Sequence, residues 1–271
     1  MKNRFISAVV LIFIAIIGTV FLPNWAFLVA VTFIIGLALY EFFSLVQKKG
    51  IPIYKPFGII VGICIPLSIY FRFEPTEKWE LAFMVGLCLV LFLLQFMRRT
   101  SADALSAVSI TFFGILYISW FFSFIIKLKL IQDISLPEGS RLVGFLLLVS
   151  KLGDIGAYLV GSKFGKHSLI PRISPKKSIE GAIGGFILSL TGAIISKTFL
   201  PTMSYLHLII LGTLLGILAQ VGDLSESLIK RDCAAKDSNN IFPGLGGVLD
   251  LIDSLLFTAP VFYFYISIIT R

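Results

Sequence analysis

The chain has 271 residues, of which 57% are hydrophobic and 14% are charged, whereas a soluble domain would carry roughly a quarter charged residues. This composition excludes an ordinary soluble protein and indicates an integral membrane protein. The net charge of +8 does not call for a nucleic-acid partner, because basic loops on one side of a membrane and anionic lipid account for it.

Apolar runs follow one another along almost the whole sequence. A membrane-spanning helix needs about 17 to 25 residues, and a window of about 19 residues finds about nine runs of roughly this length. They extend from Phe5 to Phe21, Trp25 to Val46, Phe57 to Phe71, Trp79 to Met97, Leu105 to Ile126, Leu142 to Val160, Ala182 to Phe199, Tyr205 to Val221 and Val248 to Thr270. We therefore predict an all-α, polytopic membrane protein with about nine transmembrane helices in a single domain, residues 1–271.

The basic residues are distributed unequally between the two sides of this arrangement. Short cytoplasmic loops carry an excess of Lys and Arg. The amino terminus and the loops after the second, fourth, sixth and eighth runs hold Lys2, Arg4, Lys48, Lys49, Lys55, Arg98, Arg99, Lys163, Lys166, Arg172, Lys176, Lys177, Lys230, Arg231 and Lys236. The opposite side holds far fewer. We expect a protein of the inner (plasma) membrane whose amino terminus, together with the charged stretch from Gly222 to Asp253, faces the cytoplasm.

The residues that carry chemistry are concentrated in the second half of the chain. We interpret residues 1–140 as an amino-terminal helical part, in which Glu41 is an interfacial cap or an interhelical hydrogen bond, and residues 141–271 as the catalytic part. In the sixth run, Lys151 and Asp154 lie three residues apart on one helix face. Two interpretations stay open: a neutralising pair that holds helices together, or a cation and an acid that line a polar pocket.

A basic loop follows the sixth run. Its segment ISPKKSIEG begins at Ile173 and places Lys176 and Lys177 ahead of the next helix, after a proline that stiffens the chain. Lysines offer point charges to phosphate groups. This pair can therefore bind a phosphate group, and the alternative is an ordinary basic loop that lies against lipid headgroups.

The stretch from Gly222 to Asp253 carries nine charged residues between two apolar runs. If the eighth helix continues past Gly222, one stripe of its surface contains Asp223, Glu226, Ser227 and Lys230. Asp250 and Asp253 again lie three residues apart, at the start of the ninth helix. Two helices can therefore direct carboxylates to one point.

Acids on two facing helices suit a hard cation such as Mg²⁺ when a substrate phosphate supplies the remaining oxygens. The candidate ligands are Asp223, Asp250 and Asp253. The glycines Gly246 and Gly247 leave backbone N–H groups free at a helix amino terminus, which is an anion site. The alternative is that these acids complement the helix macrodipole or lie on solvated helix faces.

These residues resemble the phosphatidate cytidylyltransferase family, the membrane enzymes that make CDP-diacylglycerol. The family pattern is S-x-x-K-R, four residues, K-D, a P-G-H-G-G turn, two residues and D-R-x-D. This sequence has at matching spacing Ser227, Lys230, Arg231, Lys236, Asp237, Pro243, Gly244, Gly246, Gly247, Asp250 and Asp253. The segment from Asp154 to Tyr158, followed by FGK and ISPKKSIEG, is similar to a second block of the family.

The sequence departs from the family pattern at two positions. Leu245 stands where the family usually has histidine, and Leu251 stands where it usually has arginine. The roles of that histidine and that arginine therefore do not carry over to this chain.

The resemblance implies that the phosphate of phosphatidic acid attacks the α-phosphorus of CTP and releases pyrophosphate, with one or two Mg²⁺ ions per site. It implies the metal ligands Asp223, Asp250 and Asp253, and the triphosphate ligands Lys230, Arg231 and Lys236. The further substrate-binding residues are Ser227, Lys176, Lys177, Asp154, Gly246 and Gly247. Asp237 would be another ligand or would orient Lys236. The implied partners are CTP, phosphatidic acid and membrane lipids, and a homodimer is left open.

Other functions need some of the same residues. A secondary transporter of an anionic or phosphorylated solute would use Lys151 and Asp154 at mid-membrane, but such folds usually show paired repeats, which the sequence lacks. A CTP-dependent kinase of lipid alcohols, or another Mg²⁺-dependent lipid-phosphate transferase, would need the same acids.

Overall fold

The protein is described by a computed structural model over residues 18–19, 21–73, 79–98, 103–131, 138–235, 238–239 and 246–269. Its long elements are all helices, as expected where lipid forces each backbone polar group to bond within its own segment. In chain order the elements are α2 (Asn24–Lys48), α3 (Lys55–Tyr70), α4 (Trp79–Phe96), α5 (Ala104–Gly114), the π-helix η1 (Ile115–Trp120), α6 (Phe121–Lys129), α7 (Gly139–Phe164), β1 (Ser168–Ile170), β2 (Ser174–Ser178), α8 (Ile179–Ile195), the 3₁₀-helix η2 (Ser196–Thr198), α9 (Tyr205–Asp232) and α10 (Val248–Ile269).

The predicted all-α membrane fold is confirmed, but the predicted number of spans is not. Among the described residues, 7 helices are long and apolar enough to cross a membrane, when residues 104–129 are taken as one helix. The predicted third run is the shorter helix α3, with 16 residues. The predicted first run, Phe5 to Phe21, lies almost entirely outside the described residues.

Two elements differ from the sequence expectation in detail. The fifth run contains the π-helix η1 between α5 and α6, which apolar periodicity cannot distinguish from an α-helix. The loop after the sixth run contains a short antiparallel hairpin, in which Ser168 pairs with Ser178 and Ile170 with Ser174.

Helix α9 agrees with the sequence expectation, because it continues past Gly222 to Asp232, as the predicted stripe of charged residues requires.

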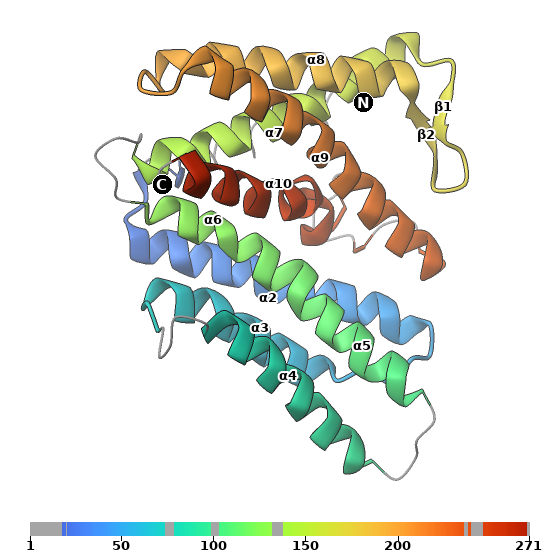
Figure 1. Ribbon diagram of the computed structural model, residues 1–271. Helices are drawn as coiled ribbons and strands as arrows, with labels where there is room; N and C mark the ends of the chain where they lie inside the picture. The colour runs from blue at the N-terminus through green and yellow to red at the C-terminus, as the bar shows by residue number, and fades with distance from the viewer. Residues whose placement is uncertain are drawn as a thin grey trace.

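Helix α10 lies at the centre of the helical bundle (Figure 1). It packs against α9, α6, α2 and α7, and therefore joins the first and second halves of the chain. Its buried residue Phe262 packs its ring against Phe145 of α7, with 5.4 Å between the ring centroids. Helix α10 is thus held by several helices, which gives the site that it carries a rigid frame.

Helices α7 and α8 pack closely along their length through small residues. A Cβ atom added to Gly156 would come 2.6 Å from the carbonyl oxygen of Gly184, and one added to Gly181 would come 2.9 Å from that of Ala157. Small residues allow such backbone contact between helices in lipid. The base of the β1–β2 hairpin, which joins these helices, is thereby fixed.

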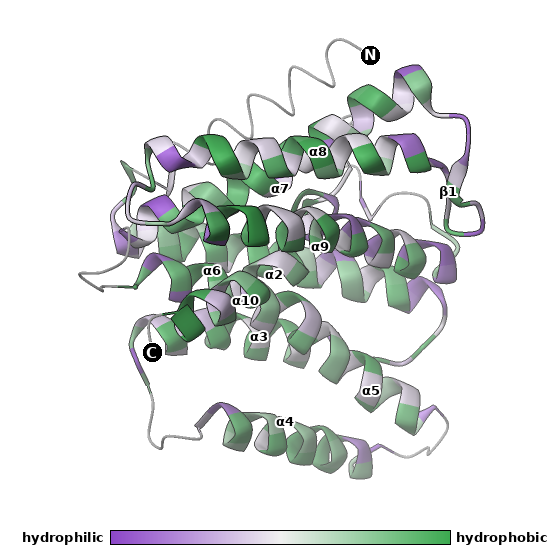
Figure 2. Ribbon diagram, turned by 45° about the horizontal axis from the view of Figure 1, so that its top comes forward, coloured by the Kyte–Doolittle hydropathy of each residue, from purple (hydrophilic) through white to green (hydrophobic). Residues whose placement is uncertain are grey.

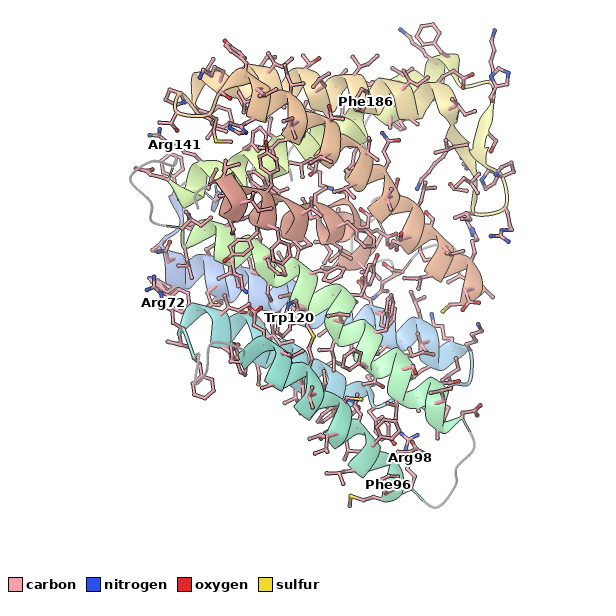
Figure 3. All side chains as sticks on the ribbon, viewed as in Figure 1. Arg72, Phe96, Arg98, Trp120, Arg141 and Phe186 are labelled. Carbon is pink, nitrogen blue, oxygen red and sulfur yellow. The ribbon has the colours of Figure 1, made fainter. Side chains whose placement is uncertain are left out.

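Apolar side chains cover the outer faces of the bundle, and Figure 2 shows the helices mainly in the hydrophobic colour. Exposed examples are Leu89 of α4, Ile183 of α8 and Ile217 of α9. The ends of the helices carry the arginines: Figure 3 places Arg98 at one end of the bundle, and Arg72 and Arg141 at the other. This distribution fits a bundle surrounded by hydrocarbon, with polar loops at both faces.

Candidate active site

One face of α9 carries the predicted stripe of polar residues. Lys177 of β2 reaches this face, where its Nζ lies 2.7 Å from Oδ2 of Asp223 and donates a hydrogen bond of 3.3 Å to Oγ of Ser227. Further along the stripe, Lys230 forms an ion pair with the fully buried Glu226. The stripe is therefore confirmed, and the hairpin supplies a cation to its first turn.

Helices α9 and α10 come into backbone contact beside these acids. A Cβ atom on Gly222 would collide with the carbonyl oxygen of Asp253, so glycine is what allows the helices to approach. The side chain of Asp253 is buried, with 6% relative exposure. Asp253 lies within electrostatic range of Asp223, Asp154, Glu226 and Lys151. The carboxylates of Asp223 and Asp253 therefore lie within electrostatic range of each other, and their role as metal ligands stays a prediction.

Asp250 is engaged differently from the other two predicted metal ligands. Its Oδ1 is paired with Lys230, and its Oδ2 accepts hydrogen bonds from the backbone N–H of Gly247 at 2.7 Å and from the N–H and hydroxyl of Ser238. Within the described residues, no three His, Cys, Asp or Glu side chains form a group that could hold a metal ion. In this conformation Asp250 is engaged by Lys230 and by the glycine turn, and the assignment of Asp223, Asp250 and Asp253 to one Mg²⁺ site stays a prediction.

The expected free N–H groups at the amino terminus of α10 are also occupied. The N–H of Gly247 bonds to Asp250, and those of Val248 and Leu249 donate to the carboxylate of Glu41 at 3.0 and 2.9 Å. These three groups are not available to an anion here, which corrects that part of the expectation. Gly246 has φ +94, a left-handed conformation that favours glycine, so its identity is explained by the turn.

The Lys151–Asp154 ion pair predicted in the sixth run is present in α7, and it is hydrogen-bonded to Ser254 of α10. Nζ of Lys151 lies 2.8 Å from Oδ2 of Asp154 and donates a 2.8 Å hydrogen bond to Oγ of Ser254. The hydroxyl of Ser254 in turn donates to Asp154 at 3.3 Å. This network joins α7 to α10 next to Asp253, in agreement with a pair that holds helices together. It also gives the region of Asp253 a polar wall.

Some predicted binding residues are not brought to this cluster. Lys176 is exposed and its neighbour Lys177 is half-buried, because successive residues of a strand point to opposite faces. Nε of Arg231 donates to the carbonyl oxygen of Ile173 at 3.2 Å, so its guanidinium braces the hairpin against α9. Leu251 is partly buried against the apolar core.

Part of the predicted site cannot be placed. Lys236 and Asp237 lie outside the described residues, as does the turn that includes Leu245. Their roles stay predictions.

Two residues of the first half of the chain contribute to this region although sequence reasoning gave them no role in it. Glu41 binds the amino terminus of α10, and its signal was a lone carboxylate within an apolar run. Tyr117 belongs to the π-helix η1 and lies within electrostatic range of Asp253, Glu226 and Asp223. Within the described residues, its buried hydroxyl has no hydrogen-bond partner.

The donor set suits a hard cation and a polyphosphate. Magnesium is usually bound by one or two carboxylates together with substrate phosphates and water, and Asp223 and Asp253 provide such a pair without a third acid. Lys177 and Lys230 place positive charge on either side along α9. The site can therefore counter the charge of a phosphate group at a membrane surface.

Comparison with known proteins agrees with this chemistry. The chain matches the family model described as the cytidylyltransferase family over residues 2–269. It is 32% identical to the phosphatidate cytidylyltransferase of Synechocystis sp., over 98% of this chain and 97% of the relative. It is 30% identical to the phosphatidate cytidylyltransferase of Bacillus subtilis, over 99% and 98%. The uncharacterized protein YnbB of Escherichia coli is 34% identical over 90% of this chain and 80% of its own length.

Proposed function

Because this chain belongs to the cytidylyltransferase family, we propose that it forms CDP-diacylglycerol and pyrophosphate from CTP and phosphatidic acid. The full-length relatives named phosphatidate cytidylyltransferase support this choice of substrates. The observation that carries the proposal is the approach of Asp223 and Asp253 at the contact of α9 and α10, with Lys177 and Lys230 beside them.

The reaction makes one bond and breaks one bond. An oxygen of the phosphatidic acid phosphate bonds to the α-phosphorus of CTP, and the bond from that phosphorus to the oxygen bridging the β-phosphorus breaks. A phosphate monoester is largely ionised near neutral pH, with a second pKa of about 6, so this nucleophile requires no strong general base. The enzyme must mainly bring two anions together and hold them in line.

The residues divide this task between them. Asp223 and Asp253 would hold Mg²⁺, which when bound stabilises the charge on the attacking and leaving oxygens. Lys177, at the partly exposed end of the cluster, would bind a substrate phosphate. Lys230 would contact the triphosphate, and Asp250 would orient Lys230 through the ion pair that joins them.

The remaining assignments follow the family pattern. Ser227, Lys236 and Asp237 would contact the nucleotide or its ligands, Arg231 would hold the hairpin against α9, and Lys176 would attract anionic headgroups from its exposed position. The diacyl chains would stay in hydrocarbon while the headgroup enters between helices. In this proposal the protein lies in the inner membrane, with the end of the bundle that carries the hairpin in the cytoplasm.

The test uses the purified chain in detergent with Mg²⁺, α-³²P-labelled CTP and phosphatidic acid. We expect labelled CDP-lipid and unlabelled pyrophosphate. The variants Asp223→Asn and Asp253→Asn should each lower kcat by roughly 100-fold or more, since one charge-stabilising contact is typically worth about 10²–10³ in rate, and chelation by EDTA should abolish turnover. Asp232→Asn is the matched control, because Asp232 forms an exposed ion pair with Lys49 instead.

The products separate the competing functions. Release of CDP with a newly phosphorylated lipid would identify a lipid kinase, and solute counterflow in proteoliposomes without CTP turnover would identify a transporter. Either result would overturn the proposed reaction. Full activity of both aspartate variants would overturn the metal assignment while leaving the reaction intact.

A further inference from the structure

Glu41 is a buried acid of α2 that contacts the start of α10. Its exposure is 1%. Oε1 accepts a 3.0 Å hydrogen bond from the N–H of Val248, and Oε2 accepts one of 2.9 Å from the N–H of Leu249 and lies 3.2 Å from the hydroxyl oxygen of Ser238. A side chain from the amino-terminal half of the chain thus accepts hydrogen bonds from the first turn of α10, the helix that carries Asp250.

The charge of Glu41 is balanced in an unusual way for a buried carboxylate. Within the described residues, Glu41 forms no ion pair with Lys or Arg. Burial of an unpaired carboxylate is costly, and here the positive end of the α10 dipole and two N–H groups stabilise it instead. The contact is therefore specific for a carboxylate at this position, and it depends on the exact start of α10.

Ser238 connects Glu41 to Asp250. The Ser238 hydroxyl lies within hydrogen-bonding distance of Oε2 of Glu41 and Oδ2 of Asp250. Gly247 lies against the same atoms, because a Cβ atom there would collide with Oγ of Ser238 and with the Glu41 carboxylate. The N–H of Gly247 bonds to Asp250 at 2.7 Å. Glu41, Ser238, Gly247 and Asp250 thus form one connected network.

The network reaches the proposed phosphate-binding cation. Asp250 pairs with Lys230 on α9, so a displacement of the turn before α10 would move Lys230 as well. We infer that Glu41 is a positioning residue of the active site, which fixes the Gly246–Gly247 turn and, through Ser238, the orientation of Asp250 and Lys230. The expected effect of Glu41 on kcat rests on the proposed function, but its effect on the conformation of the Gly246–Gly247 turn does not.

The test compares Glu41→Gln with the wild-type chain and with the control Glu80→Gln. Glutamine has nearly the same volume, but its NH₂ group cannot accept the N–H that Oε2 accepts. Glu80 of α4 pairs with Lys127 and has no part in the network, so its variant controls for the loss of one carboxylate. We expect Glu41→Gln to lower kcat by roughly 10- to 100-fold, as for other residues that orient a ligand, and Glu80→Gln to leave kcat unchanged.

Two further readouts separate positioning from folding and from the reaction itself. Ser238→Ala removes the hydroxyl bridge alone, and we expect it to lower kcat as well while the melting temperature stays within a few degrees of wild type. Hydrogen–deuterium exchange of peptides covering residues 246–250 should rise about tenfold in Glu41→Gln, because loss of about 1.4 kcal/mol of protection corresponds to tenfold in exchange.

The outcomes are distinct for the two proposals. If the wild-type chain makes no CDP-lipid, the proposed function fails, and the exchange measurement still tests the role of Glu41. If exchange at residues 246–250 is unchanged in Glu41→Gln, the positioning role is overturned whatever the activity. A kcat equal to that of the wild type in both Glu41→Gln and Ser238→Ala would also overturn the positioning role. So would a lower melting temperature of Glu41→Gln with an unchanged kcat per folded molecule, because the residue would then act only on stability.

Discussion

At the scale of single residues, most charges of the site are neutralised by a named partner. Lys177 pairs with Asp223, and Lys151 pairs with Asp154. Ion pairs in a region of low dielectric fix geometry even where they add little net stability, because removal of one partner leaves a buried charge. The site is thus a set of preformed contacts. Tyr117 differs, since its buried hydroxyl has no hydrogen-bond partner in the described part of the chain.

This difference predicts the effect of Tyr117→Phe. A buried hydroxyl without a partner destabilises the folded state by roughly 1 to 3 kcal/mol, so its removal should raise the melting temperature of the apo protein in detergent by a few degrees. The ring contacts with Phe113 and Phe257 are kept in the variant. An unchanged or lower melting temperature would show that the hydroxyl has a partner, such as an ordered water near the acids.

At the scale of elements, the site depends on how closely α9 approaches α10. The contact at Gly222 brings the backbone of one helix against that of the other, and it places Asp223 in the same region as Asp253. The glycines between α7 and α8 act in the same way on the hairpin side. Small residues at helix contacts are therefore part of the active-site geometry as well as of the packing.

Gly222→Ala tests this dependence. The added methyl group would collide with the carbonyl oxygen of Asp253, and overpacking of this kind typically costs about 1 to 3 kcal/mol. We expect lower thermal stability together with a loss of activity of about tenfold or more, since small displacements of reacting groups are costly. Gly86→Ala is the control, because an added Cβ there meets nothing within 4 Å. Equal behaviour of the two variants would contradict the close-contact account.

At the scale of the whole molecule, the bundle has two chemically different ends. One end carries the hairpin, the exposed Lys49–Asp232 ion pair and the carboxyl-terminal end of α9. The other end carries Arg72 and Arg141 (Figure 3). The excess of basic residues at the first end favours the cytoplasm for it, which would bring CTP and the site to the same side.

Thiol labelling tests this orientation. In a variant with Cys64, Cys88 and Cys233 replaced by serine, single cysteines are introduced at the exposed positions Lys163 and Arg72. A membrane-impermeant maleimide applied to intact cells should label the cysteine at position 72 and should label that at position 163 only after the membrane is opened. The reverse pattern would place the site outside the cytoplasm.

The sequence by itself determined the class of the protein and most of its elements. Hydropathy located the membrane helices because lipid requires long apolar segments, and spacing located the stripe from Asp223 to Lys230 because helical periodicity is local. The resemblance to the family rested likewise on residues close together in the chain. These properties need no knowledge of which helices are neighbours.

The tertiary structure decided which charges meet. It paired Asp250 with Lys230, brought Lys177 rather than Lys176 to Asp223, and occupied the start of α10 with Glu41. Each outcome depends on packing between segments distant in sequence, with Glu41 separated by 207 residues from Val248. Residue spacing cannot encode such contacts, because they arise from the way α10 is enclosed by helices from both halves of the chain.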